Sequence, residues 1–154
     1  KLVGLHALDS LRLEKGYKHW GADITTDDNP FEAGLGFCVK MDRGDFIGRD
    51  ALAEKLKAQP ERKLVIFTLE DPEPLIYHDE PIYRDGELVS ENTHGSFSHV
   101  LNGAIGMCYL KNPGGINDEW ITSGKYEINI EGKMFPIKIH LEPPYDPKSE
   151  RVRM

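Results

Sequence analysis

The sequence lacks long hydrophobic runs and has few cysteines. No run of about 18 apolar residues occurs in the 154-residue chain, so we expect no membrane-spanning segment. The two cysteines, Cys38 and Cys108, each stand among apolar residues. This favours two small buried thiols in a reducing compartment over a disulfide. No secretory signal is visible, and the missing initial Met leads us to interpret the start as artificial.

The sequence also has fewer basic than acidic residues. The chain carries 19 Lys and Arg against 26 Asp and Glu, which gives a formal net charge of −7. Affinity for nucleic acid depends largely on neutralising phosphates with basic side chains. An acidic surface repels phosphate, so we exclude nucleic acid as a partner.

Several motifs of catalysis and cofactor binding are absent. Gly34-Leu35-Gly36 lacks the third glycine of a dinucleotide-binding loop, because Val39 stands in its place, so we interpret it as a tight turn. There is no phosphate-binding Gly-Lys-Ser loop and no Gly-x-Ser-x-Gly nucleophile motif. The six histidines, including His94 and His99, show no metal-ligand spacing. We therefore expect no metal site and interpret the histidines as scattered surface residues.

The first 59 residues have a mainly helical pattern. Leucines at positions 2, 5, 8 and 13 predict an amphipathic helix that ends before Gly16. A second helix is predicted within 45–58, beginning near Gly48 or Asp50. Between them we expect a polar loop over 23–30 and a turn followed by a strand over 30–40.

Short strands and turns follow Pro60. Asp85-Gly86 between two apolar pairs is the strongest hairpin signal of the chain, and Glu131-Gly132-Lys133 predicts a second hairpin. With no convincing helix to cover a sheet, about six short antiparallel strands are expected to close into a small barrel. We expect the tail from Pro143 to be extended and partly loose. The strands are predicted over 63–70, 82–83, 88–89, 104–110, 125–130 and 134–140.

Two features near the first helix, formed by three residues, each have a structural and a functional interpretation. Asp9 and Arg12 form an i, i+3 pair of opposite charge that joins one helical turn to the next. Trp20 is either an aromatic anchor in a core or the wall of a ligand site. From the residues alone, a structural role is favoured for both features.

The order and spacing of several runs resemble the aminomethyltransferase (glycine cleavage T-protein) family. The first half is similar to the end of that family's folate-binding module, and the second to its terminal barrel. The resemblance implies an α+β fragment of a folate-binding module over 1–59, followed by a small all-β antiparallel barrel over 60–154. It is carried by Gly4-Leu5-His6-Ala7-Leu8-Asp9-Ser10-Leu11-Arg12-Leu13-Glu14-Lys15-Gly16-Tyr17, Trp20-Gly21-Ala22-Asp23-Ile24, Asn29-Pro30-Phe31-Glu32-Ala33-Gly34-Leu35, Phe46-Ile47-Gly48-Arg49-Asp50-Ala51-Leu52, His94-Gly95-Ser96-Phe97-Ser98 (similar to a Ser-Gly turn) and Ala104-Ile105-Gly106-Met107-Cys108-Tyr109.

Within this family the chain resembles the flavoprotein branch of dimethylglycine and sarcosine dehydrogenases. The glycine-cleavage branch usually has Arg where this chain has Leu8. That Arg is a substrate and folate contact in the family, and Leu8 cannot donate a hydrogen bond, so no folate contact carries over. The resemblance implies that Arg12, Glu14 and Trp20 belong to the wall of the folate cavity, with Arg12 the most important.

The resemblance also implies a mechanism shared between two cofactors. In such enzymes an amino-terminal FAD domain oxidises an N-methyl amine, and the resulting iminium reaches a folate site, where tetrahydrofolate captures it as the methylene derivative. The family's catalytic Asp and pterin-binding Glu lie upstream of this sequence, so we expect no catalytic residue here and weak or no folate binding by this part alone. The expected partners are a small methylated amine, folate and the rest of the same chain, in the cytoplasm or mitochondrial matrix.

Two alternatives stay open. One is a stand-alone folate-dependent aminomethyltransferase or demethylase without a flavin domain, against which Leu8 and Trp20 weigh mildly. The other is a non-catalytic scaffold that has kept the fold and lost the site. The upstream reading frame distinguishes them: a Gly-x-Gly-x-x-Gly signature favours the flavoprotein, a short upstream region the transferase, and an upstream module without the catalytic acid the scaffold.

Overall fold

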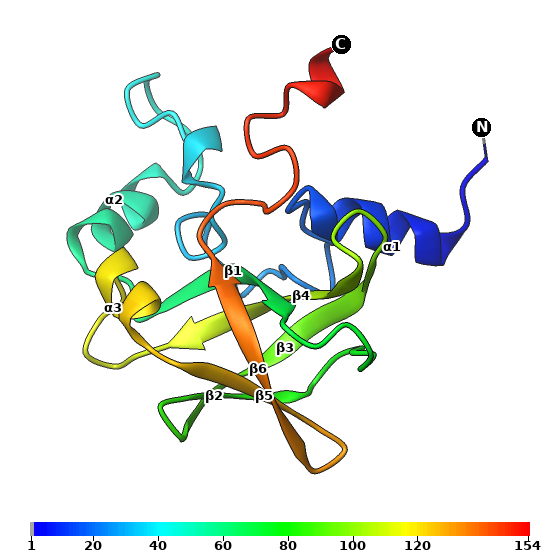
Figure 1. The fold of residues 1–154 in the computed structure, drawn as a ribbon. Coiled ribbons are helices and arrows are strands. Elements are labelled where there is room, and N and C mark those ends of the chain that lie inside the picture. The colour runs from blue at the N-terminus through cyan, green and yellow to red at the C-terminus, as the bar shows by residue number, and fades with distance from the viewer. Residues whose placement is uncertain (1) are drawn as a thin grey trace.

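A closed barrel of antiparallel strands forms the centre of the molecule. The computed structural model describes residues 2–154. The strands follow the order β1-β4-β3-β2-β5-β6 around the barrel, and β6 pairs back with β1 (Figure 1). The predicted barrel is therefore confirmed. Its strands are β1 (Arg62–Leu69), β2 (Pro81–Arg84), β3 (Glu87–Ser98), β4 (Gly103–Lys111), β5 (Tyr126–Ile130) and β6 (Lys133–His140).

Two tight hairpins lie where the sequence predicted them. Asp85 and Gly86 join β2 to β3 with φ angles of 52° and 86°. Glu131 and Gly132 join β5 to β6 with φ angles of 50° and 83°. Positive φ at both central residues matches the right-handed twist of the paired strands. The local turn chemistry thus sets the register next to both turns, and the β2–β3 register shifts beyond it, between Ile82 and Tyr83.

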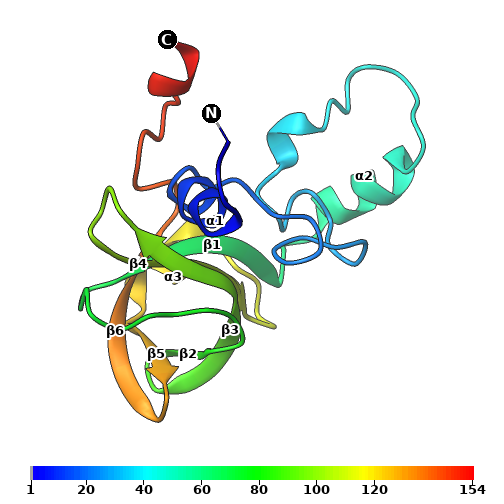
Figure 2. The same cartoon turned by 90° about the vertical axis from the view of Figure 1, so that its right-hand side faces the viewer.

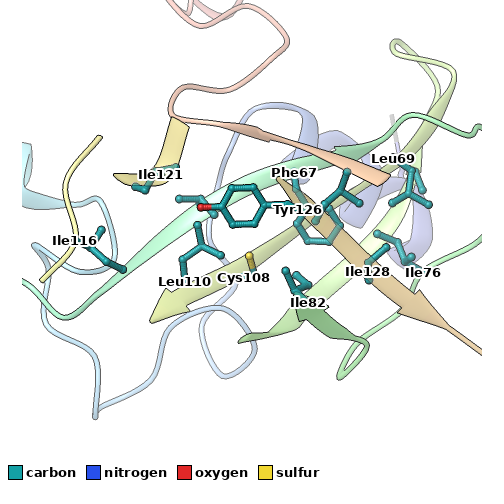
Figure 3. Close-up of a cluster of buried hydrophobic side chains, with 13 residues drawn as sticks. Phe67, Leu69, Ile76, Ile82, Cys108, Leu110, Ile116, Ile121, Tyr126 and Ile128 are labelled. Carbon is teal, nitrogen blue, oxygen red and sulfur yellow. The ribbon is translucent and has the colours of Figure 1, made fainter. Parts of the chain in front are cut away.

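The barrel interior is filled by large apolar side chains that point toward one another (Figure 3). Phe67 is fully buried at the centre of this cluster. Gly106 faces it across the β1–β4 pair, and a Cβ at position 106 would lie 2.6 Å from Phe67 Cζ. The glycine thus leaves the space that the phenyl ring occupies.

A short helix, α3 (Asp118–Ser123), was missed by the sequence pattern. Its N-cap is Asn117, whose side chain accepts a 2.7 Å hydrogen bond from the Trp120 amide. Ile121 from this helix is 1% exposed and joins the barrel core. Six residues are too few to show a helical period, so the prediction of strands without a helix was wrong here.

The part before the barrel contains two α-helices, α1 (Leu5–Glu14) and α2 (Arg49–Lys57). Both were predicted, although α1 begins three residues later than the leucine pattern suggested. The strand expected within 30–40 is wrong: turns and a short 3-10 helix, η1 (Gly36–Cys38), occupy this segment. Its glycines gave no apolar alternation that could pair with a neighbouring strand.

Helix α1 lies across the outer face of the barrel beside β3 and β4 (Figure 2). Leu13 is the one leucine of α1 that is buried, in a second apolar cluster with Ile66 of β1 and Met107 of β4. The residues of β4 from Gly103 to Leu110 are all buried, because one face meets the barrel interior and the other meets α1. This packing fixes the position of α1 on the barrel.

The two cysteines differ in their surroundings. Both are free thiols, as expected; Cys108 is buried in the barrel, but Cys38 is exposed, so the prediction of burial was wrong for Cys38. Burial raises the pKa of the Cys108 thiol, which therefore stays protonated and behaves as a small apolar group. Cys38 lies in η1, whose residues are not packed into a core.

Among residues 2–154, no helix has the length and apolar character needed to cross a bilayer.

The C-terminal tail is attached to the end of α1. Lys15 Nζ lies 3.0 Å from Asp146 Oδ2 and donates a 2.6 Å hydrogen bond to the Asp146 carbonyl. A last 3-10 turn, η2 (Arg151–Arg153), follows. The expectation of an extended, partly loose tail is therefore corrected, because the tail contains turns and is held by a partly buried ion pair.

Candidate functional site

Glu14 joins α1 to the barrel. The residue is 2% exposed. Its carboxylate accepts hydrogen bonds from Ser98 Oγ at 2.7 Å and from Val100 N at 3.1 Å. One turn earlier, Ser10 Oγ donates a 2.7 Å hydrogen bond to the Phe97 carbonyl. All three hydrogen bonds fall on the end of β3 and the turn that follows it. They fix the position along β3 at which α1 crosses the sheet.

Arg12 is the centre of a buried charge network. Its Nε donates a 3.0 Å hydrogen bond to Asp9 Oδ1, as the i, i+3 spacing predicted. Its Nη1 pairs with Asp23 Oδ2 and also donates to the Tyr17 carbonyl at 3.3 Å. The side chains of Arg12 and Asp23 are 8% and 0% exposed. Removing one partner from such a pair leaves an uncompensated buried charge, so the network holds α1 and the following loop in one arrangement.

Asp23 connects this network to a β-bulge. Its Oδ2 accepts from His19 N at 2.8 Å, and its Oδ1 accepts from Thr93 Oγ1 at 2.7 Å. The register of β3 against β4 shifts between Asn92 and His94, which places Thr93 at the bulge. A bulge changes the face to which the following side chain points. Polar side chains from α1, the loop after it and β3 thus meet beside His94.

A hollow of about 410 Å³ lies between the start of α1 and strand β3. Leu5, His6 and Asp9 line it from the helix side. The barrel side combines apolar walls with two imidazoles, and it is made of Leu75, Ile76, Tyr77, His78, His94, Gly95, Ser96 and Phe97. Apolar walls with a few convergent polar groups are typical of small-molecule sites. This hollow is the candidate functional site.

His94 lies in the hollow beside Asp9, the residue of the buried network that also lines it. Its Nε2 lies 3.6 Å from Asp9 Oδ1, the same oxygen that accepts from Arg12. Burial lowers the pKa of His94, the positive charge of Arg12 lowers it further, and Asp9 acts in the opposite direction. The neutral imidazole is therefore favoured at neutral pH, so that it can accept or donate a hydrogen bond in the hollow.

The structure separates the three residues that the resemblance assigned to the folate wall. Arg12 lies directly behind the hollow and contacts it through Asp9. Glu14 points instead to the turn after β3. Trp20 is 65% exposed, which makes the core interpretation of this residue wrong. A role of the three in folate binding stays a prediction.

The helix presents an apolar face to solvent next to the hollow. Leu5 and Leu8 are 67% and 53% exposed, and Leu11 is 55% exposed. Leu2 and Val3, just before α1, are exposed as well. Such a contiguous apolar surface marks a site for another part of a protein or for a ligand.

Sequence reasoning missed His94, Thr93 and Asp23 as members of one cluster. His94 was interpreted as part of a scattered surface population, and it is only partly exposed. The available signal was weak: Asn92-Thr93-His94 is a polar run within a segment that has few apolar residues. The family resemblance placed a turn at His94-Gly95-Ser96, but these residues lie inside β3, so that detail was wrong.

Within residues 2–154, no group of three or more His, Cys, Asp or Glu side chains is placed to hold a metal ion. His6, His78 and His94 line the same hollow, but they do not form such a group. The candidate site consists of hydrogen-bonding and apolar groups.

Comparison with known proteins gives two family matches. The glycine cleavage T-protein C-terminal barrel domain matches residues 62–146, and the GCVT N-terminal domain matches residues 1–43. The solved structure of glycine cleavage system aminomethyltransferase T from Bartonella henselae superposes with a TM-score of 0.82 and 28% identity. The match covers 96% of this chain and 40% of that one.

Curated relatives extend the comparison. The chain is 43% identical over 154 residues to 4-methylaminobutanoate oxidase (formaldehyde-forming) of Paenarthrobacter nicotinovorans, covering 99% of this chain and 18% of that protein. It is 37% identical to mitochondrial sarcosine dehydrogenase of Homo sapiens, covering 98% and 17%. It is 35% identical to the mitochondrial pyruvate dehydrogenase phosphatase regulatory subunit of Mus musculus, covering 92% and 17%.

The chain thus spans less than a fifth of the length of these relatives. The family match to the barrel alone covers more than half of the chain, and the structural match covers nearly all of it. The chain belongs to the glycine cleavage T-protein (aminomethyltransferase) family.

Proposed function

We propose that this chain is the carboxy-terminal part of the folate module in a flavin-dependent N-methyl amine dehydrogenase of the dimethylglycine or sarcosine type. The whole enzyme passes a one-carbon unit to tetrahydrofolate in the cytoplasm or mitochondrial matrix. The observation that carries the proposal is the exposed apolar face of α1 beside a hollow backed by buried charges. The 43% identity to an oxidase that is several times longer supports the same function.

The residues of the hollow fit a folate group. Leu5, Leu75 and Phe97 provide apolar surface for an aromatic ring system, and His94 provides a hydrogen-bonding group. Behind the hollow, Arg12 Nη2 is buried and has no hydrogen-bond partner among residues 2–154, so one donor of the network is unpaired. In this proposal the hollow supplies one side of the folate cavity. The proposal also divides the chain into the end of the folate module (1–59) and the barrel (60–154).

The residues of this chain position groups and exclude water. Arg12 holds Asp9, and Asp9 in turn faces the His94 ring at the edge of the hollow. Leu5 and Leu8 give the apolar surface against which the preceding part of the module closes. When bound, tetrahydrofolate supplies the nitrogen nucleophiles that accept the one-carbon unit. Exclusion of water matters because an N-methylene iminium hydrolyses to formaldehyde in water.

Two other functions of the same family remain candidates. A stand-alone aminomethyltransferase is supported by the likeness to the Bartonella henselae protein. A non-catalytic module is supported by the 35% identity to a relative named as a regulatory subunit. The reading frame upstream separates them from the flavoprotein, because each requires a different preceding module.

The test is a calorimetric titration with tetrahydrofolate of the intact protein and, in parallel, of the 154-residue chain. The intact protein should bind with a Kd on the order of micromolar, and the chain alone weakly or not at all. The intact protein should also show a flavin absorption spectrum. Micromolar binding by the chain alone, or an intact protein without affinity for folate, contradicts the proposal.

A further inference from the structure

A second hollow, of about 500 Å³, lies at the opposite end of α1 from the candidate site. Its floor is the outer face of the barrel, formed by Leu64 and Ile66 of β1 and by Met107 of β4. Its walls are the turn after α1 and the C-terminal tail. In Figures 1 and 2 the tail and the segment after α1 both lie on the α1 side of the barrel.

The wall formed by the tail is held by specific contacts. Lys15 Nζ donates to the Asp146 carbonyl at 2.6 Å and lies 3.2 Å from Ser149 Oγ. Gly16 has a φ of 69° and packs so closely on Pro143 that a Cβ would lie 2.8 Å from Pro143 Cγ. The hollow therefore has a built shape, with the tail packed against the end of α1.

The charges around this hollow are unevenly compensated. Lys15 is paired with Asp146, and Lys63 Nζ lies 2.6 Å from Asp118 Oδ1. Within the part of the chain that the structure describes, Lys18 has no such ion pair, although it is half-buried. Of the three lysines in the lining, Lys15 and Lys63 are thus paired and Lys18 is not, and the one carboxylate of the lining, Glu142, is exposed and has no ion pair among residues 2–154.

The environment of Lys18 disfavours its charge. Burial lowers the pKa of Lys18, and the charges of Asp23 and Cys38 offset this effect in part. Asp23 is already bonded to Arg12, to the His19 amide and to Thr93, so its charge is shared among several donors. A bound anion would stabilise the ammonium form.

We propose that this second hollow binds a small amphipathic monocarboxylate, whose carboxylate pairs with Lys18 and whose hydrocarbon part lies on Leu64, Ile66 and Met107. The combination of one uncompensated ammonium group with apolar surface selects both halves of such a ligand. This site is separate from the hollow between α1 and β3 that contains Asp9 and His94. It does not depend on the function proposed for that hollow.

The test uses hexanoate as the probe and hexan-1-ol as its uncharged match, followed by amide chemical shifts in NMR spectra of the chain. Hexanoate should shift the amides of residues 15–18 and 64–66 with a Kd on the order of 1 mM. Hexan-1-ol should bind about tenfold more weakly, because it leaves the ammonium group without a partner.

Three variants assign the effect to Lys18. Lys18→Met should weaken hexanoate binding about tenfold, whereas Lys18→Arg keeps a charge and should retain it. Lys63→Met is the matched control, because Lys63 lines the same hollow but is already paired. Equal binding of hexan-1-ol, undiminished binding by a folded Lys18→Met, or no shifts with hexanoate would each overturn the proposal. If Lys18→Met does not fold, the two probes are compared on Lys18→Arg. This variant should bind hexanoate about tenfold more tightly than hexan-1-ol, and equal binding would overturn the proposal.

Discussion

The barrel and the segment before it are stabilised by different kinds of interaction. Of the twenty buried hydrophobic residues among positions 2–154, all but Leu13 and Ala33 belong to the chain from Leu64 onward. By contrast, the buried charged residues all lie in the first segment: Asp9, Arg12, Glu14 and Asp23. In the part of the chain that the structure describes, eleven of the twenty exposed large hydrophobic residues also lie before position 60.

This difference shows how a segment without its own core is held in place. The barrel buries enough apolar surface to form a core, and hydrophobic burial is the dominant favourable contribution to folding. The first segment is attached to it through one apolar contact region around Leu13 and through directional polar contacts. Directional contacts fix geometry, and the remaining apolar side chains stay available for another surface.

The largest expected effect comes from the barrel core. Phe67→Ala should lower the free energy of unfolding by about 3–5 kcal/mol, because Phe67 is fully buried and its removal leaves a cavity. The same substitution at Phe37, which is 73% exposed, should change it by less than about 0.5 kcal/mol. Urea unfolding followed by circular dichroism measures both. Equal losses would contradict the assignment of the core to the barrel.

Arg12→Met should cost about 3 kcal/mol, because it leaves the buried carboxylates of Asp9 and Asp23 without their cation. Arg43→Met is the control, since Arg43 is exposed. In hydrogen exchange, the amides around His19 should lose protection, as the His19 amide donates to Asp23. An unchanged unfolding midpoint for Arg12→Met would show that charge does not hold this segment.

Glu14→Gln should lower stability by about 1–2 kcal/mol, since it weakens two hydrogen bonds to a buried carboxylate. The effect should be local: the Val100 amide exchanges faster, while the amides of β1 keep their protection. Glu87→Gln changes an exposed carboxylate in the same way and serves as the control. Loss of protection throughout the barrel would mean that Glu14 supports the core rather than the attachment of α1.

The His94 imidazole should make stability depend on pH. Burial and the charge of Arg12 lower its pKa below 6.5, so the unfolded chain binds the proton more readily. The contribution of the neutral His94 ring to the free energy of unfolding is therefore fully present well above pH 6.5 and is lost as the pH falls below it. The loss should be less than about 1 kcal/mol, because the ring is partly exposed. His94→Asn should reduce this dependence in unfolding curves measured between pH 7 and 5. His140 has a lowered pKa as well, so His140→Asn provides the comparison.

The smallest effect is expected on the exposed face of α1. Leu8→Ala should change the stability of this chain by less than about 0.5 kcal/mol, whereas Leu13→Ala on the same helix should cost about 2–5 kcal/mol. In the intact protein Leu8→Ala should cost more, because the proposed neighbouring surface covers it. Equal effects of Leu8→Ala in the chain and in the intact protein would argue against that surface.

Local sequence signals predicted much of the barrel. Asp85-Gly86 and Glu131-Gly132 carry their own turn preference, so both hairpins were found at the correct residues. Segments with weak patterns were not: η1 was predicted as a strand, and α3 was missed because it is shorter than two helical turns. The burial of Cys38 and Trp20 was also predicted wrongly, since composition does not tell which surface of a loop meets the core.

The candidate site depended far more on tertiary structure. The sequence by itself determined the α1 ion pair of Asp9 and Arg12, the two tight hairpins and the family resemblance, because each rests on residues close together or on a recognisable order. Only the folded chain brought Asp23 and Thr93 together across 70 positions and turned His94 toward Asp9. A β-bulge and the seating of a helix on a closed barrel are properties of strand pairing over long separations, and no local pattern of residues specifies them.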